Sequence, residues 1–456
     1  MVTYLLTPAN ASATTADVCV AAVSLNEPPQ APANAFLEER SSGRRTPVGG
    51  WDQWLVPDAS AGMLSARVQL SGFAPRTVHP IDLVVDSAIV ADATVTTLPD
   101  RLPVIGDKPF TIMLGSCFYV PGDNGRVGRR FAALPSDLRP DVKFLCGDQV
   151  YLDAPFYRFL VPRTRQGLAE SFLERYWDTW AQPGAGAGPG FRDVLKRGAT
   201  FFTADDHEFW NNAPFPSFAV NTWTAGGRDA WWTLASGLFN AFQTPGSPAS
   251  QQLAVGDLSI FVADTRISRA ADRTTFIEPA AMQALATWAA GLTSPGVLVV
   301  GQPVFAREAG WSGRVADWNL PDFEQYATLC RILLTAPQSI VMLTGDVHYG
   351  RVAQLSTIDG HELLEIIASP MSLVAAGGNR EWKSSPALFP DAPIPGVVQT
   401  PIRSLATWQR AEDHFVTLEL WQEGQRLQMR VRTWETSPNS STPSTPVFEY
   451  GLLRRM

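Results

Sequence analysis

The stretch IVMLTGDVHYG, residues 340–350, joins an apolar strand pattern to a short polar ending. The mostly apolar residues 340–344 are typical of a buried strand, and Asp346 and His348 follow directly. These two residues lie two positions apart, so on an extended backbone their side chains point the same way. Both can therefore serve one ion or two neighbouring ions.

The same arrangement recurs along the second part of the chain. Seven apolar strands each finish in polar residues, in the order Ser116–Cys117, Asp148, Asp205–Glu208, Asp264, Gln302, Asp346–His348 and Ser369. In layered α/β folds, functional sites lie beyond the carboxyl ends of strands. Carboxylates buried together there repel one another, and burial of each charge is costly. The pattern therefore predicts bound cations.

Each of these motifs has an ordinary structural explanation when it stands alone. A Gly-Asp pair after a strand commonly forms a turn or a helix cap, a single histidine commonly packs in the core, and Cys117 or Tyr151 would be core residues. Repetition at one structural position favours a site. In GDQVY, Asp148 and Tyr151 are three residues apart, so one turn beyond the strand could direct both at one ion.

Composition predicts a folded protein with two domains. The chain has 456 residues, of which 45% are hydrophobic and 18% are charged. Residues 1–105 alternate apolar and polar positions over short runs, which predicts an all-β sandwich ending at the proline-rich segment 98–109. From there, residues 106–456 alternate strands with helical segments at 276–292 and 322–336, which indicates an α/β domain.

Charge and hydropathy exclude several classes of partner. A net charge of −8 argues against wrapping a nucleic-acid backbone, and no apolar run is long enough for a membrane span. The N-terminus has no secretory signal pattern, so the sequence as written indicates a cytoplasmic protein, or a periplasmic or secreted one if a signal has been removed. The four cysteines form no disulfide framework, and Cys146 and Cys330 are predicted to be core thiols. The sequence carries no indication of oligomeric state.

The motifs GDQVY, DDHEFWNN, VADTR, VVGQ, GDVH and IIASPMS occur in that order between residues 148 and 372. Together they resemble the PhoD-like alkaline phosphatases of the calcineurin-like metallophosphoesterase superfamily, over residues 109 to 450. The resemblance implies an α/β fold, a metallophosphoesterase double β-sheet sandwich flanked by helices, with an N-terminal all-β sandwich domain. It also implies a site with several metals.

The resemblance implies a ligand set for each metal. Fe3+ would be held by Cys117, Asp148, Tyr151 and His348. Asp148 would bridge to a divalent ion, Ca2+ or alternatively Mn2+ or Mg2+, whose other ligands would be Asp206, Asp346 and Gln302. Such oxygen ligands suit these hard cations better than zinc.

The implied activity is hydrolysis of a small phosphorylated substrate, a phosphate monoester, a diester or both. His207 would be the general acid, and Glu208 would either orient it or lie at the surface. Arg266 could bind phosphate, but it is predicted instead to hold the site together by pairing with an acid. Trp223, Trp231 and Trp232 could line the substrate entrance, but they are predicted instead to pack in the core. The alternatives are a phosphodiesterase of narrow, phospholipase D-like range and a catalytically silent metal-binding protein.

Overall fold

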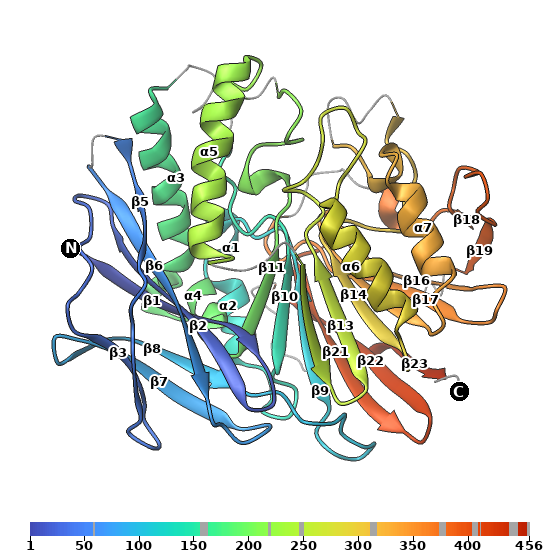
Figure 1. The fold of residues 1–456 in the computed structure, drawn as a ribbon, viewed down its shortest axis with the longest axis horizontal. Helices are drawn as coiled ribbons and strands as arrows, with labels where there is room; N and C mark the ends of the chain where they lie inside the picture. The colour runs from blue at the N-terminus through green and yellow to red at the C-terminus, as the bar shows by residue number, and fades with distance from the viewer. Residues whose placement is uncertain are drawn as a thin grey trace.

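The structure is a computed structural model of the chain. It describes residues 1–57, 60–155, 163–217, 220–245, 250–310, 317–373, 380–403, 409–410, 412–436 and 446–453. Four β-sheets and two groups of helices make up these residues (Figure 1).

The first eight strands form two four-stranded antiparallel sheets, as the alternating pattern of residues 1–105 predicted. One has the order β1 (Thr3–Ala11), β2 (Thr15–Ser24), β6 (Gly62–Ser71) and β5 (Asp52–Leu55). The other has the order β4 (Arg45–Pro47), β3 (Ala35–Glu39), β7 (Val78–Val85) and β8 (Ala88–Thr96). The predicted N-terminal β-sandwich is confirmed.

The third sheet has six strands and combines parallel and antiparallel pairs. Its order is β11 (Ala199–Thr203), β10 (Val142–Cys146), β9 (Phe110–Gly115), β21 (His414–Glu423), β22 (Arg426–Glu435) and β23 (Pro446–Leu453). Strands β9, β10 and β11 are parallel, so their carboxyl ends meet at one edge.

The fourth sheet has nine strands. The main path runs through β12 (Ser250–Val255), β13 (Leu258–Ala263), β14 (Gly296–Val300), β15 (Ile340–Thr344), β17 (Glu362–Ile367), β16 (Gly350–Ser356), β19 (Thr400–Arg403) and β18 (Leu388–Phe389), and β20 (Gln409–Arg410) pairs with β16. Strands β13, β14, β15 and β17 are parallel.

Helices cover the outer faces of these two sheets (Figure 1). The larger group comprises α1 (Val120–Asp123), α2 (Arg126–Ala132), α3 (Arg165–Trp180), α4 (Phe191–Leu195) and α5 (Ala225–Phe242), and it shares an apolar cluster with residues of β10 and β11. On the other side, α6 (Pro279–Ala290) and α7 (Tyr326–Leu334) pack on β13, β14 and β15. Both helices are shorter than the segments predicted for them.

The two large sheets pack face to face through apolar residues. Residues of β9, β10 and β21 form one buried cluster with residues of β13, β14 and β15. These parallel strands are buried on both faces, which explains their uninterrupted apolar sequences. The same cluster continues into β1, β2, β6 and β7, so the domain boundary at residue 105 stays a prediction.

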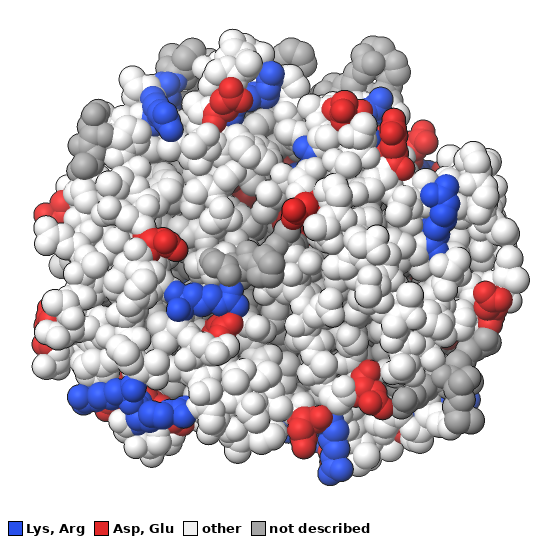
Figure 2. Space-filling model, in the orientation of Figure 1, with Lys and Arg blue, Asp and Glu red and all other residues white. Residues whose placement is uncertain are grey.

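Surface and cysteine features agree with the sequence. Acidic and basic side chains are intermingled on the face shown in Figure 2 rather than gathered into one basic patch. Among the described residues, none of the helices has the length and apolar character needed to cross a membrane. All four cysteines are free and buried, as expected for Cys146 and Cys330.

Candidate metal centre

Glycines let the ligand-bearing loops approach one another closely. A Cβ on Gly147, before Asp148, would lie 2.4 Å from the Cβ of Asp205. A Cβ on Gly345, before Asp346, would lie 2.6 Å from the Cβ of Ser116. Neither position has room for a side chain, so glycine at both allows the ends of β9, β10, β11 and β15 to converge.

Four candidate ligands have left-handed backbone conformations: Cys117 (φ 56°), Asp148 (φ 60°), Asp346 (φ 68°) and His348 (φ 49°). Such conformations cost non-glycine residues on the order of 1–3 kcal/mol and need support from their surroundings. The expectation that Asp346 and His348 lie on extended backbone is therefore wrong. Two tight turns, Val347 N to Gly345 O and His348 N to Asp346 O, replace it and still bring both side chains to the site.

Hydroxyl groups from neighbouring strand ends hold these turns. The backbone N–H of Asp346 donates to Ser116 Oγ at 2.9 Å, and that of His348 donates to Ser369 Oγ at 3.0 Å. Ser369 Oγ in turn donates to Cys117 Sγ at 3.2 Å. The serines after β9 and β17 thus position residues after β15.

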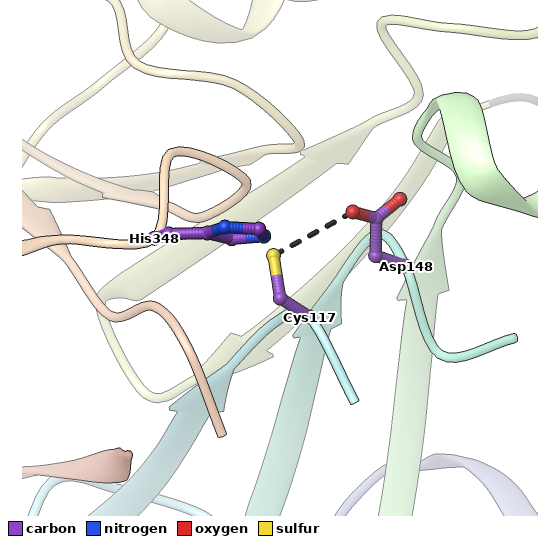
Figure 3. Close-up of side chains that lie close together, drawn as sticks. All are labelled: Cys117, Asp148 and His348. Carbon is purple, nitrogen blue, oxygen red and sulfur yellow. Dashed lines mark hydrogen bonds between the residues drawn. The ribbon is translucent and has the colours of Figure 1, made fainter. Parts of the chain in front are cut away.

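The four residues predicted to hold Fe3+ lie together, and Figure 3 shows three of them, Cys117, Asp148 and His348. Asp148 Oδ2 is 3.6 Å from Cys117 Sγ and 3.1 Å from Tyr151 Oη. Tyr151 Oη is 3.5 Å from His348 Nε2. Donor atoms of Cys117, Asp148 and His348 all lie within 4.8 Å of one another, close enough to surround one ion.

The electrostatics of this cluster match a cation site. Burial, followed by neighbouring carboxylates, raises the pKa of Asp148, of the Cys117 thiol and of the Tyr151 phenol well above their ordinary values, although His207 opposes the shift at Asp148. Burial, with His207 nearby, lowers the pKa of His348 to about 4, so its imidazole is neutral and able to bind a metal. A bound cation would supply the positive charge that these acidic groups need to ionise.

A second group of carboxylates adjoins the first. Donor atoms of Asp148, Asp206 and His207 lie within 4.8 Å of one another, as do those of Asp346 with Asp205 and Asp317. Burial, and then the carboxylates around it, raises the pKa of Asp346 well above its ordinary value. These groups offer oxygen ligands on both sides of Asp148.

Gln302 contacts Asp346 through its nitrogen. Gln302 Nε2 donates to Asp346 Oδ2 at 2.8 Å, and Gln302 Oε1 accepts from Arg269. The guanidinium can only donate, so it fixes the amide in this orientation. Ligation of a metal by the Gln302 oxygen would require the side chain to turn away from Arg269, and it stays a prediction.

His207 is held by a residue that the sequence did not indicate. Its Nδ1 lies 2.7 Å from Asp153 Oδ1, while Asp153 Oδ2 accepts from the backbone N–H of Asn211 at 2.7 Å. Burial opposes the charged imidazolium, but Asp153, Asp206 and Asp148 outweigh it and hold the pKa of His207 well above its ordinary value. Asp153 therefore orients the imidazole of His207 and contributes to its raised pKa.

Neither expected role of Glu208 is correct. The side chain is fully buried and does not contact His207; it accepts from the backbone N–H groups of Asp148, Gln149 and Asp205 at 2.8, 2.6 and 2.9 Å. Burial raises its pKa to about 7, although the three backbone donors favour the carboxylate. Glu208 thus holds the turn that presents Asp148.

Arg266 pairs with acids, as predicted. Its guanidinium donates to Asp205 Oδ1 and Asp317 Oδ2, each at 2.5 Å, and is fully buried. Arg269 lies 3.6 Å from Asp317 on the other side. The two arginines compensate Asp205 and Asp317, and this leaves Asp148, Asp206 and Asp346 for cations.

Four of the candidate ligands, Asp148, Asp206, Asp346 and His348, line a cleft of about 430 Å³ together with His207. Of the predicted packing residues, Trp231 is buried and Trp232 stacks on Phe209 at 4.2 Å, which agrees with a core role, whereas Trp223 is 48% exposed and the core expectation for it is wrong.

Comparisons with known proteins establish the fold. No protein-family model matches the sequence, and no match is found among curated protein sequences. A solved structure of PhoD is similar, with a TM-score of 0.64 and 14% identity over 98% of this chain and 90% of that chain. The purple acid phosphatase PPD1 from yellow lupin (Lupinus luteus) seeds is also similar, with a TM-score of 0.55 and 10% identity over 97% of this chain and 73% of that chain. The chain therefore shares the fold of PhoD, as the resemblance of its motifs predicted.

Proposed function

We propose that the protein is a metal-dependent hydrolase of phosphate esters, acting on monoesters, diesters or both. The observation that carries this proposal is the cluster of Cys117, Asp148, Tyr151 and His348, of which Asp148 and His348 line the same cleft as His207. The likeness to a structure named as a phosphatase supports it. The substrate is a small phosphorylated molecule.

The donor set suits two kinds of cation. A thiolate, a phenolate, a carboxylate and an imidazole favour Fe3+ at the first position. The carboxylates Asp148, Asp206 and Asp346 favour Ca2+, or Mn2+ or Mg2+, at the second. Cations bound at these positions would neutralise the phosphate oxygens and activate the attacking water.

His207 supplies the proton for the leaving group. Asp153 accepts from Nδ1, so Nε2 is the ring atom free to donate to the ester oxygen. The Asp153 carboxylate also raises the pKa of His207, which favours the acid form of the imidazole. The proton moves from Nε2 to the alkoxide as the P–O bond breaks.

The first test is metal content by mass spectrometry with a visible spectrum, followed by turnover of aryl phosphate mono- and diesters. We expect one iron per chain with a tyrosinate absorption, a divalent ion, and turnover. His207→Ala should retain the metals and lower turnover by about 10²–10⁴. His79→Ala is the matched control, because His79 pairs with Glu39 in the N-terminal sheet and should leave turnover unchanged.

Two results would redirect the proposal. Unchanged turnover of His207→Ala would refute its role as the acid. A fully metal-loaded protein that hydrolyses neither monoesters nor diesters would instead favour a catalytically silent metal-binding protein.

A further inference from the structure

The cleft is larger than a phosphoryl group requires. Its volume of about 430 Å³ lies in the range of sites that enclose an organic ligand. The residues that line the cleft include candidate metal ligands and His207. The lining also includes an apolar wall, defined here as Phe305, Ala306, Val347, Trp382 and Pro386, in which Val347 lies between the candidate ligands Asp346 and His348 in sequence.

A buried ion pair between Arg351 and Glu365 holds this apolar wall in place, and Arg351 also lines the cleft. Arg351 on β16 donates to Glu365 on β17 at 2.8 Å and to the carbonyl oxygen of Phe305 at 2.9 Å, and it reaches the carbonyl oxygen of Trp382 at 3.4 Å. Glu365 accepts from the backbone N–H groups of Val304 and Phe305 at 2.6 and 2.9 Å. Two adjacent strands therefore position both segments of the wall.

The rim of the cleft is also cross-linked. Asn319 Nδ2 donates to the carbonyl oxygen of Arg307 at 2.9 Å, and Arg307 Nη2 donates to the carbonyl oxygen of Ser385 at 3.1 Å. These contacts join three segments of the cleft lining. The apolar wall is thus pre-organised, which lowers the entropy cost of binding a ligand against it.

We propose that the apolar wall binds the organic group of the substrate, and that this group has a flat apolar face of the aryl type. This inference rests on the proposed function and narrows its substrate class. Ala306, Val347 and Trp382 belong to one buried apolar cluster, so an aryl ring against them gains apolar contact and aromatic packing. A polyol in the same place would lose hydrogen bonds to water without replacement. Polar substituents would point to the Arg307 and Asn319 rim.

Binding of two non-hydrolysable probes tests this inference without turnover. Phenylphosphonate and methylphosphonate share a phosphonate head and differ in the organic group, so the ratio of their dissociation constants reports the apolar wall. We expect phenylphosphonate to bind the protein supplied with iron and calcium about tenfold more tightly than methylphosphonate, as measured by calorimetry. This comparison uses the unmodified chain and does not depend on the folding of any variant.

Variants then assign the preference to Trp382. Trp382→Ala should reduce the ratio to less than about threefold through weaker binding of phenylphosphonate alone. Trp223→Ala is the control, because Trp223 is 48% exposed and is not among the lining residues of the cleft. It should preserve the ratio.

The outcomes separate this inference from the proposed function. Equal binding of the two phosphonates would overturn the aryl subsite and leave a phosphoesterase of another substrate class. An unaltered ratio in a folded Trp382→Ala variant would overturn the assignment to the apolar wall. Absence of binding by both probes would overturn the subsite together with the proposed function.

Discussion

Replacing Glu208 with glutamine tests how the fold positions Asp148. Glu208 Oε2 accepts from the N–H groups of Asp148 and Asp205, and Oε1 accepts from that of Gln149. A glutamine retains one of these oxygens and places an NH2 group against the remaining donor or donors. Each buried donor left unsatisfied costs about 1–3 kcal/mol, so Glu208→Gln should lower the free energy of unfolding by about 2–4 kcal/mol.

The loss of the hydrogen bonds to Glu208 should be detected in two assays. Urea denaturation of the metal-free protein measures the free energy of unfolding without the stabilisation that bound metal adds. Mass spectrometry of the folded variant should show reduced metal content, because the displaced turn carries Asp148, the residue shared by both candidate metal positions.

Glu365→Gln separates the local effect from general instability. Glu365 is also fully buried and accepts from two backbone N–H groups, but these belong to Val304 and Phe305, neither of which is a candidate ligand. This variant should be destabilised and keep its metals. Equal metal loss in both variants, or unchanged stability and metal content of Glu208→Gln, would refute the reasoning.

Three further predictions concern metal content, charge and pH. Cys117→Ala should lower iron content by mass spectrometry, while Cys146→Ala, another buried thiol, should not; full iron loading of Cys117→Ala would exclude a ligand role. Arg266→Met should lower the free energy of unfolding by about 3–5 kcal/mol in urea denaturation, because it leaves the buried Asp205 carboxylate uncompensated and Asp317 paired with Arg269 alone, and an unchanged midpoint would contradict that. Burial lowers the pKa of Lys143 to about 7, so above that pH the unfolded chain binds more protons than the folded chain. The free energy of unfolding should therefore rise between pH 7 and 10, by on the order of 1–3 kcal/mol more than in Lys143→Met. Equal slopes of the free energy of unfolding against pH in the two proteins would refute this.

The strand-end residues could be predicted because their signal is local. An apolar run followed by Gly-Asp or Ser-Cys marks a position in the chain, and parallel strands bring such positions to one edge. This strand-end pattern and the family resemblance together predict one cluster of Cys117, Asp148, Tyr151 and His348. The structure brings these four residues together. The same apolar strands, alternating with helical segments, predicted an α/β domain, and the family resemblance implied its double β-sheet sandwich.

The supporting residues could not be predicted because their partners depend on the geometry of turns. Asp153 lies five residues after Asp148 and meets His207 only when the chain folds back beyond β10. Glu208 sits beside His207 in sequence yet bonds to other loops. Left-handed conformations at Asp346 and His348 likewise depend on hydroxyl groups from distant strands.

These supports explain how the chain maintains a site that opposes its own stability. The candidate ligands combine left-handed backbone with buried acids whose charges repel, and both features are unfavourable by themselves. The compensating contacts come from residues outside the proposed ligand set: Ser116 and Ser369 hold two turns, and Glu208 holds a third. Arg266 neutralises acids beside the site. Cation binding would relieve the remaining repulsion, so metal loading should stabilise the fold as well as support the chemistry.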